Sequence, residues 1–146
     1  MKCYIFDIDG TLADCKHRLH HIQKSPKDWD SFFDACKDDD IIAHVLFVAH
    51  ALAATGYPIV CVSGRSDRVR LDTDWWLRVK AGLFPSALYM RREGDHRDDD
   101  IIKVELLAEL RADGWEPIMA FDDRNRVVNA WRSAGIPCAQ VAPGDF

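Results

Sequence analysis

Long hydrophobic runs are missing from this sequence, and no apolar segment approaches the roughly 18 residues that a membrane-spanning helix needs. A signal-peptide layout is also missing, because the N-terminus passes straight into an apolar strand. No internal repeat, low-complexity run or linker interrupts the 146 residues. We therefore expect one cytoplasmic domain over residues 1–146, with no membrane partner.

Paired cysteine motifs are absent. The five cysteines are odd in number, scattered, and never spaced as C-x-x-C. This pattern argues against a zinc site or a disulfide framework and favours reduced thiols in a cytoplasm. Cys3, Cys61 and Cys138 fall in apolar strand contexts, so we expect them to pack in the core.

An excess of positive charge is missing too, since 24 acidic residues outnumber 19 basic ones and the formal net charge is −5. Proteins that hold a long stretch of nucleic acid usually present a basic surface. The balance therefore argues against extended nucleic-acid binding. It does not exclude an enzyme that binds only one end of a strand. Much of the acidic excess also lies in the candidate metal site, where a bound cation would offset it.

What the sequence does contain is an alternation of strand-like and helix-like segments. We expect strands near residues 3–8, 58–63, 86–90, 117–122 and 137–141, and helices near 28–37, 41–55, 66–81, 99–113 and 124–134. The first, second and fourth strands are almost continuously apolar, which is typical of strands covered on both faces. The alternation predicts a three-layer α/β fold with a mostly parallel sheet of about five strands. Ligands bind such sheets beyond the carboxyl ends of the strands.

Several helix ends carry recognisable signals. Asp40 is a candidate N-cap for the second helix, and Gly56 and Gly114 are candidate C-terminal glycines for the second and fourth helices. The acidic run 38–40 is interpreted as a solvated, helix-capping segment. These signals predict where the helices begin and end.

Residues 3–11 read CYIFDIDGT, an apolar strand that ends in two carboxylates and a glycine turn. Side chains alternate along a strand, so Asp7 and Asp9 lie on the same side of the chain. Carboxylates this close repel each other, and a divalent cation or a shared proton relieves the repulsion. Gly10 allows the backbone to approach a ligand closely. A capped Asp-Gly turn without chemistry is the alternative interpretation of this segment alone.

Three later segments place further reactive groups at predicted strand ends or helix starts. Residues 57–65 read YPIVCVSGR, and residues 117–124 read PIMAFDDR and end in a second carboxylate pair. Lys103 lies in the first turn of a predicted helix, after the acidic run 98–100. In this order the four segments resemble the motifs of the haloacid dehalogenase (HAD) superfamily of aspartate-nucleophile phosphatases. The resemblance implies a Rossmann-like HAD domain.

The resemblance also implies a role for each motif residue. Asp7 would be the nucleophile that forms an aspartyl phosphate, and Asp9 would be the general acid and base. Ser63 would donate a hydrogen bond to the phosphate, and Lys103 would supply a positive charge beside it.

A Mg²⁺ cofactor is implied as well. Asp7, Asp122 and the backbone carbonyl of Asp9 would hold the ion, with Asp123 as an indirect or water-mediated ligand. Such oxygen ligands suit Mg²⁺ rather than zinc.

The arginines point to a more specific family within the HAD superfamily. The segments 63–65, 91–103, 121–124 and 140–146 resemble the phosphatase half of phage-type polynucleotide kinase-phosphatase, and the likeness runs almost end to end. Guanidinium groups suit such a site because they bind phosphate oxygens bidentately. The substrate-binding residues implied are Thr11, Arg18, Gly64, Arg65, Arg91 and Arg97, with Asp99 as a supporting carboxylate.

The likeness is weakest over residues 20–40, and the alternation does not explain residues 13–40. We interpret 13–40 as a small lid insert after the first motif, too short for a separate cap domain, which leaves the site open to a bulky substrate. His17 and His21 have i, i+4 spacing that could suggest a metal site, but a solvated lid segment is the favoured interpretation.

An aromatic group occupies the same insert. Trp29, Phe32 and Phe33 have i, i+3, i+4 spacing, which predicts that they fasten a lid helix to the core. Contact with a nucleic-acid base is the alternative. For the adjacent Trp75 and Trp76, we expect one to pack on the sheet and the other to be partly exposed, rather than a base-stacking role.

The leading hypothesis is a Mg²⁺-dependent phosphatase that removes 3′-phosphates from DNA or RNA ends and could also open 2′,3′-cyclic phosphates, in a phage or bacterial cell. One alternative is a HAD phosphatase that acts on nucleotides or other small phosphorylated metabolites. A more remote alternative is a non-catalytic phospho-receiver. The chain contains no G-x-x-x-x-G-K-[ST] loop, so we expect no kinase activity from it.

Overall fold

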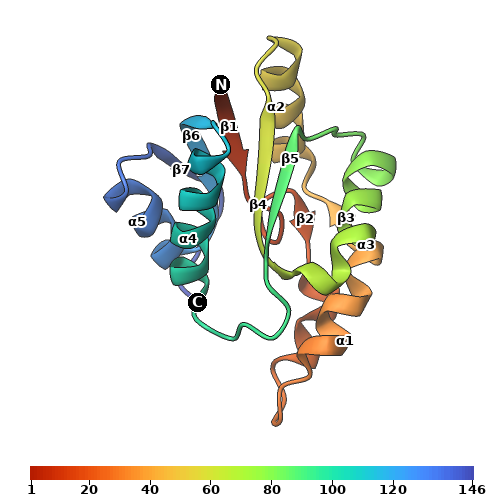
Figure 1. The fold of residues 1–146 in the computed structure, drawn as a ribbon. Coiled ribbons are helices and arrows are strands. Elements are labelled where there is room, and N and C mark those ends of the chain that lie inside the picture. The colour runs from red at the N-terminus through yellow and green to blue at the C-terminus, as the bar shows by residue number, and fades with distance from the viewer.

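The computed structural model describes all of residues 1–146 and places a five-stranded sheet between two layers of helices (Figure 1). The strand order is β5-β4-β1-β6-β7, and all four neighbouring pairs are parallel. The strands are β1 (Lys2–Phe6), β4 (Ile59–Ser66), β5 (Ala87–Arg91), β6 (Glu116–Asp122) and β7 (Cys138–Gln140). The predicted α/β architecture with about five mostly parallel strands is confirmed.

Alternation along each strand divides the core into two layers. Cys3 and Ile5 of β1 face α4 (Asp99–Ala112) and α5 (Asn125–Ser133), which contribute residues such as Leu110 to the same cluster. Phe6 and Ile8 belong to the opposite cluster, with residues of α2 (Ala43–Ala54) and of the segment after α3 (Arg70–Trp75). Both faces of the central strands are therefore covered, which explains their continuous apolar sequence.

The second helix begins later than the sequence predicts. Asp40 and Ile41 form the short strand β3 (Asp40–Ile41), which pairs antiparallel with β2 (Ala13–Asp14). The N-cap of α2 is Ile42, with no side-chain capping bond, so the prediction that Asp40 caps this helix is wrong. The C-terminal signals are confirmed, because Gly56 and Gly114 follow their helices with φ of 92° and 96°.

The predicted helix over 66–81 is divided into three pieces. A 3₁₀ turn at Asp67–Val69 leads into α3, and a π-helical turn follows at Trp76–Lys80. The wider turn is closed by a hydrogen bond of 2.9 Å from the Ala81 N–H to the Trp76 carbonyl. Trp76 is fully buried and Trp75 is 43% exposed, as the sequence analysis predicted.

The insert 13–40 holds β2, the 3₁₀ helix η1 (Lys16–His21), α1 (Trp29–Asp34), the 3₁₀ helix η2 (Ala35–Asp38) and the start of β3. The pairing of β2 with β3 joins its two ends, and Figure 1 shows α1 beyond the end of the sheet where β4 ends. The predicted helix 28–37 thus consists of α1 and η2, and Asp28 caps it by accepting from the Ser31 N–H at 3.0 Å. The insert is a small antiparallel addition rather than a cap domain.

All five cysteines are free thiols, and the predicted core positions of Cys3, Cys61 and Cys138 are confirmed by their burial. None of the helices combines the length and apolar character that a membrane crossing requires.

The adjacent tryptophans provide a matched test of the packing. Trp76 donates its indole N–H to the buried backbone carbonyl of Asp39 at 2.9 Å. Trp76→Phe keeps most of the ring but leaves that carbonyl unpaired, so we expect unfolding free energy to fall by about 1–3 kcal/mol in urea denaturation. Trp75→Phe should change it by less than about 0.5 kcal/mol. Equal effects of the two substitutions would contradict this account.

Candidate active site

The predicted motif residues meet at the carboxyl ends of the three central strands. Asp7 follows β1, Ser63 and Arg65 lie in β4, and Asp122 is the last residue of β6. Lys103 enters from the second layer, on α4. This is the position that the parallel sheet topology predicts for a ligand site.

A buried lysine joins two of the carboxylates. The Lys103 ammonium donates to Asp7 Oδ1 at 2.6 Å and to Asp122 Oδ2 at 2.8 Å, and its side chain is 1% exposed. Asp7 Oδ2 accepts from the Thr11 hydroxyl at 3.0 Å, and Asp122 Oδ2 also accepts from the Trp131 indole at 3.2 Å. The orientations of Asp7 and Asp122 are therefore fixed by groups from three different segments.

The same cluster has an excess of negative charge. Burial raises the pKa of Asp7 well above its ordinary value, and the neighbouring Asp122 raises it further. Burial and Asp122 also raise the pKa of Asp123 to about 6. The pKa of Lys103 is raised because its two carboxylate partners outweigh the effect of burial. A second positive charge would relieve this repulsion.

Asp7, Asp122 and Asp123 each offer a carboxylate oxygen, and these oxygens lie within 4.8 Å of one another. Oxygen-only ligands in such a cluster fit a hard divalent cation such as Mg²⁺. No other group of three histidine, cysteine or acidic side chains in the chain has such an arrangement, and His17 and His21 are not part of one.

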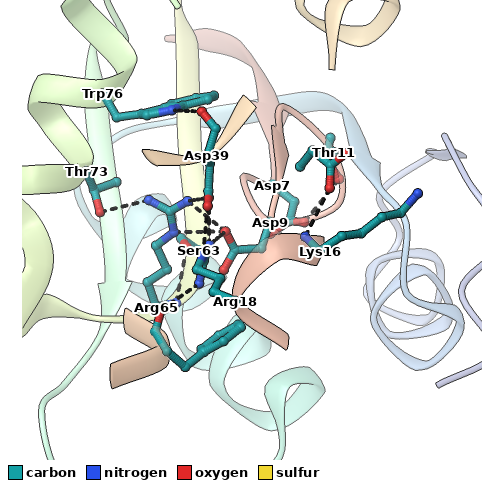
Figure 2. A network of polar contacts seen from close by, with 12 residues as sticks. Asp7, Asp9, Thr11, Lys16, Arg18, Asp39, Ser63, Arg65, Thr73 and Trp76 are labelled. Carbon is teal, nitrogen blue, oxygen red and sulfur yellow. Dashed lines mark hydrogen bonds and ion pairs between the residues drawn. The ribbon is translucent and has the colours of Figure 1, made fainter. Parts of the chain in front are cut away.

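The carboxylate of Asp9 points toward two arginines (Figure 2). Its Oδ1 accepts from Arg18 at 2.6 Å and from two nitrogens of Arg65 at 2.7 and 2.9 Å. Burial alone would raise the pKa of Asp9, but Arg65 and Arg18 outweigh it and lower the pKa to about 2. The bridge between Asp9 and Ala13 uses the neighbouring Ile8 carbonyl and Gly10 N–H, so it leaves the Asp9 carbonyl unused.

Asp39 holds the arginine pair from the opposite side. Its Oδ2 accepts from Arg18 at 2.7 Å and from Arg65 at 3.0 Å, and its Oδ1 accepts from Arg18 Nε at 2.8 Å. His17 lies 2.7 Å from the same Oδ1. Asp39 is completely buried, so the interpretation of residues 38–40 as a solvated capping run is wrong for this residue. Two buried guanidinium groups require a second carboxylate, and Asp39 supplies it.

Further contacts complete the arginine network. Arg65 donates to the Thr73 hydroxyl at 3.1 Å, and Arg18 donates to the Phe32 carbonyl at 3.2 Å with its guanidinium 4.3 Å from the Phe32 ring centre. Figure 2 shows Thr73, Asp39 and Asp9 around the Arg65 guanidinium. Sequence reasoning missed the roles of Asp39 and Thr73. The only available signal was the pair of arginines. Asp9 alone would leave one of their two positive charges unbalanced, which indicates that a second carboxylate is needed.

Ser63 and Gly64 directly precede Arg65 in β4. The Ser63 hydroxyl, which is almost fully buried, accepts from the Arg65 N–H at 3.1 Å. A Cβ at Gly64 would collide with Asp99 Oδ1, so this glycine allows the Asp99 carboxylate to approach the loop. Asp99 also pairs with Arg91 at 3.2 Å and with Arg124 at 3.8 Å.

Two predicted substrate arginines are engaged elsewhere. Arg91 donates to the Gly64 carbonyl at 2.8 Å and to the carbonyls of Asp95 and Arg97. These bonds connect the end of β4 to the loop that precedes α4. The Arg97 side chain is half-exposed and pairs with Asp95 and Glu105. The structure therefore does not bring Arg97 to the carboxylate cluster.

The chain matches the family described as the polynucleotide kinase PNKP phosphatase domain over residues 1–146. It belongs to this family. A chain of the solved Pnkp1/Rnl/Hen1 complex is 32% identical with a TM-score of 0.83, and the match covers 99% of this chain and 47% of that one. A structure of the Pnkp1/Rnl/Hen1 RNA repair complex gives the same identity and TM-score.

A more distant solved structure agrees on the fold. A haloacid dehalogenase-like hydrolase from Streptococcus pneumoniae has 14% identity and a TM-score of 0.67, with 94% of this chain and 83% of that chain covered. A bifunctional polynucleotide kinase/RNA ligase from Autographa californica nuclear polyhedrosis virus is 28% identical over 93% of this chain and 18% of its own length. The chain thus spans less than half of the length of the viral protein and of the matched chain of the Pnkp1/Rnl/Hen1 complex.

We predict that Asp39→Asn weakens the fold, because a neutral amide leaves two buried guanidinium groups with only one carboxylate. The expected loss is about 3 kcal/mol of unfolding free energy in a denaturant titration. Asp40→Asn is the matched control, since the neighbouring Asp40 side chain is 91% exposed and should have little effect. Similar losses for both variants would contradict the proposed importance of Asp39.

The carboxylate cluster predicts a pH-dependent stabilisation by divalent cations. Because the pKa of Asp123 is raised to about 6, its ionisation in the folded protein destabilises the cation-free fold as pH rises from about 4 through 6. A bound cation removes that penalty, so Mg²⁺ should raise the unfolding midpoint more at pH 7 than at pH 5. Differential scanning fluorimetry checks this, with NaCl of equal ionic strength as the control. An equal rise at both pH values, or none, would contradict the prediction.

Proposed function

We propose that this chain is a Mg²⁺-dependent phosphatase that hydrolyses 3′-phosphates at polynucleotide ends through an aspartyl phosphate on Asp7. The observation that carries the proposal is the lysine-bridged Asp7, placed beside Asp9 and its buried arginine pair. Phosphoryl transfer needs a positioned nucleophile and positive charge around the phosphate oxygens, and these groups supply both. The family match adds the polynucleotide to the proposal.

In the first step an Asp7 carboxylate oxygen attacks phosphorus, and the bond from phosphorus to the 3′-oxygen breaks. Asp9 gives its proton to the departing oxygen, which leaves as a hydroxyl. All the guanidinium contacts of Asp9 use Oδ1, so Oδ2 is the oxygen through which we expect the proton to move. Asp9 is ionised at rest. When phosphate oxygens take over hydrogen bonds from Arg18 and Arg65, the pKa of Asp9 rises from its low resting value, and Asp9 takes up from the solvent the proton that it then donates.

In the second step Asp9 accepts a proton from water, and the water oxygen attacks phosphorus. The bond from phosphorus to Asp7 breaks and inorganic phosphate leaves. Lys103 neutralises Asp7 as it becomes a free carboxylate again, and Ser63 offers a hydrogen bond to the phosphate.

Asp7, Asp122 and the Asp9 carbonyl would hold a Mg²⁺ ion, with Asp123 as an indirect or water-mediated ligand, and the ion would add positive charge beside the phosphate oxygens. The chain's own groups still perform the proton and phosphoryl transfers.

RNA ends are the first substrates to test, because the similar proteins include a member of an RNA repair complex and a kinase/RNA ligase. DNA ends and 2′,3′-cyclic phosphates remain within the proposal. The second candidate is a phosphatase of small phosphorylated metabolites. Its support is the fold that the chain shares with a haloacid dehalogenase-like hydrolase.

The test is phosphate release from a 3′-phosphorylated oligoribonucleotide, with and without Mg²⁺. A 5′-phosphorylated twin, free 3′- and 5′-mononucleotides, and the DNA equivalent run in parallel. We expect Mg²⁺-dependent release that is specific for the 3′ end of the oligonucleotide.

Asp7→Asn should abolish that release while the protein stays folded, because the amide is no nucleophile yet relieves the carboxylate repulsion. Near-native release by Asp7→Asn would refute Asp7 as the nucleophile. A preference for mononucleotides would favour the small-metabolite phosphatase.

A further inference from the structure

The chain has a negative net charge, but one of its segments is strongly basic. Residues 16–27 read KHRLHHIQKSPK and contain four lysine or arginine side chains and no acidic one. Since the whole chain carries −5, the remaining residues together carry −9. The segment comprises η1 and the turn that precedes α1, within the insert.

Lysines in and near this segment lack partners within the protein. Of the 19 lysine and arginine side chains, only Lys2, Lys16, Lys27 and Lys37 make neither a hydrogen bond nor an ion pair, and the last three lie in the insert. The only contact of Lys24 is Asp28 at 4.0 Å, where both side chains are exposed. Outside the insert, Lys2 is the only lysine or arginine without such a contact, so the unpaired lysines concentrate in the insert, where they are available to an anionic partner.

The segment begins directly at the arginine network. Arg18 contacts Asp9 at 2.6 Å and His17 contacts Asp39 at 2.7 Å, so their neighbour Lys16 stands at the edge of the site. Figure 2 shows the Lys16 side chain extending away from the arginine network. In Figure 1 the α1 part of the insert lies beyond the carboxyl ends of the central strands.

A partly exposed aromatic ring follows the segment by two residues. Trp29 is 40% exposed, and the Lys27 ammonium lies 5.8 Å from its ring centre. Trp29 packs edge-on against Phe32 at 5.7 Å, and the Phe32 ring lies 4.3 Å from the Arg18 guanidinium. The Trp29 ring centre is therefore no more than about 10 Å from Arg18, close enough for a nucleotide near the reacting end to reach it.

We propose that residues 16–29 form the contact surface for the single strand that precedes the 3′-phosphate. Lys16, Lys24 and Lys27 bind backbone phosphates, and Trp29 stacks on an unpaired base. The proposal rests on the polynucleotide function proposed above, and it explains how an acidic protein holds a polyanionic substrate. The bound strand is single, because only a base that is not paired with another base can stack on Trp29.

The direct test is binding of a fluorescent single-stranded oligoribonucleotide with a 3′-hydroxyl, measured by anisotropy at several salt concentrations. The variant K16A/K24A/K27A should reduce the slope of log affinity against log salt by about 2, because each single-strand phosphate contact contributes about 0.7. The matched control K2A/R78A/R111A removes three cations outside the insert and should keep the native slope. Equal slopes for the two triple variants would overturn the lysine contacts.

Trp29→Ala tests the stacking. It should weaken binding of the same oligonucleotide at least about fivefold, whereas Trp75→Ala, which removes another half-exposed tryptophan, should leave binding within about twofold. Native affinity for Trp29→Ala would overturn the stacking contact.

A turnover measurement separates this surface from the proposed chemistry. K16A/K24A/K27A should lower kcat/KM for a 3′-phosphorylated oligonucleotide about tenfold and leave kcat/KM for a 3′-mononucleotide unchanged. Equal losses on both substrates would overturn the surface. Absence of phosphate release from every substrate would refute the phosphatase function instead, while the binding results on the 3′-hydroxyl strand would still decide whether the surface exists.

Discussion

Compensation of buried charge is the constraint on which the rest of this structure depends. Lys103 lies between Asp7 and Asp122, and Asp39 and Asp9 lie on either side of Arg18 and Arg65. Each of these groups is costly to bury alone and becomes tolerable only with its partners in place. The parallel sheet brings the partners together, because the ends of β1, β4 and β6 meet at one edge and α4 carries Lys103 to the same point. The fold and the site are therefore stabilised by the same contacts.

Asp9 is the member of the arginine network that lies nearest to Asp7 in the sequence. It is two residues from Asp7, yet its carboxylate is held by arginines on the insert side rather than by Lys103. In the proposed mechanism, a substrate phosphate that reaches Asp7 competes with Asp9 for the same guanidinium groups. On this account the arginines both bind the phosphate and release the acid that the leaving oxygen requires, so binding and proton transfer are coupled by shared hydrogen bonds.

Much of the fold was predictable because its signals are local. The alternation of strand-like and helix-like segments identified all five strands of the main sheet, and Gly56 and Gly114 ended their helices as expected. Asp39 was not predictable, because its neighbours Asp38 and Asp40 are exposed and nothing in the run of three marks the middle residue as buried. Its burial results from the pairing of β2 with β3 and from partners 21 and 26 residues away in the sequence. The interrupted helix after β4 and the inward contacts of Arg91 likewise depend on tertiary packing, which overrides local pattern.

The central claim is that Asp7 carries the phosphoryl group during turnover. The most direct measurement is borohydride reduction of the enzyme quenched during turnover of a 3′-phosphorylated oligonucleotide, followed by peptide mass spectrometry. An acyl phosphate on Asp7 would be reduced to the alcohol, so we predict homoserine at position 7 and at no other aspartate. Phosphate release without any modified residue, or with homoserine at another carboxylate, would contradict the account.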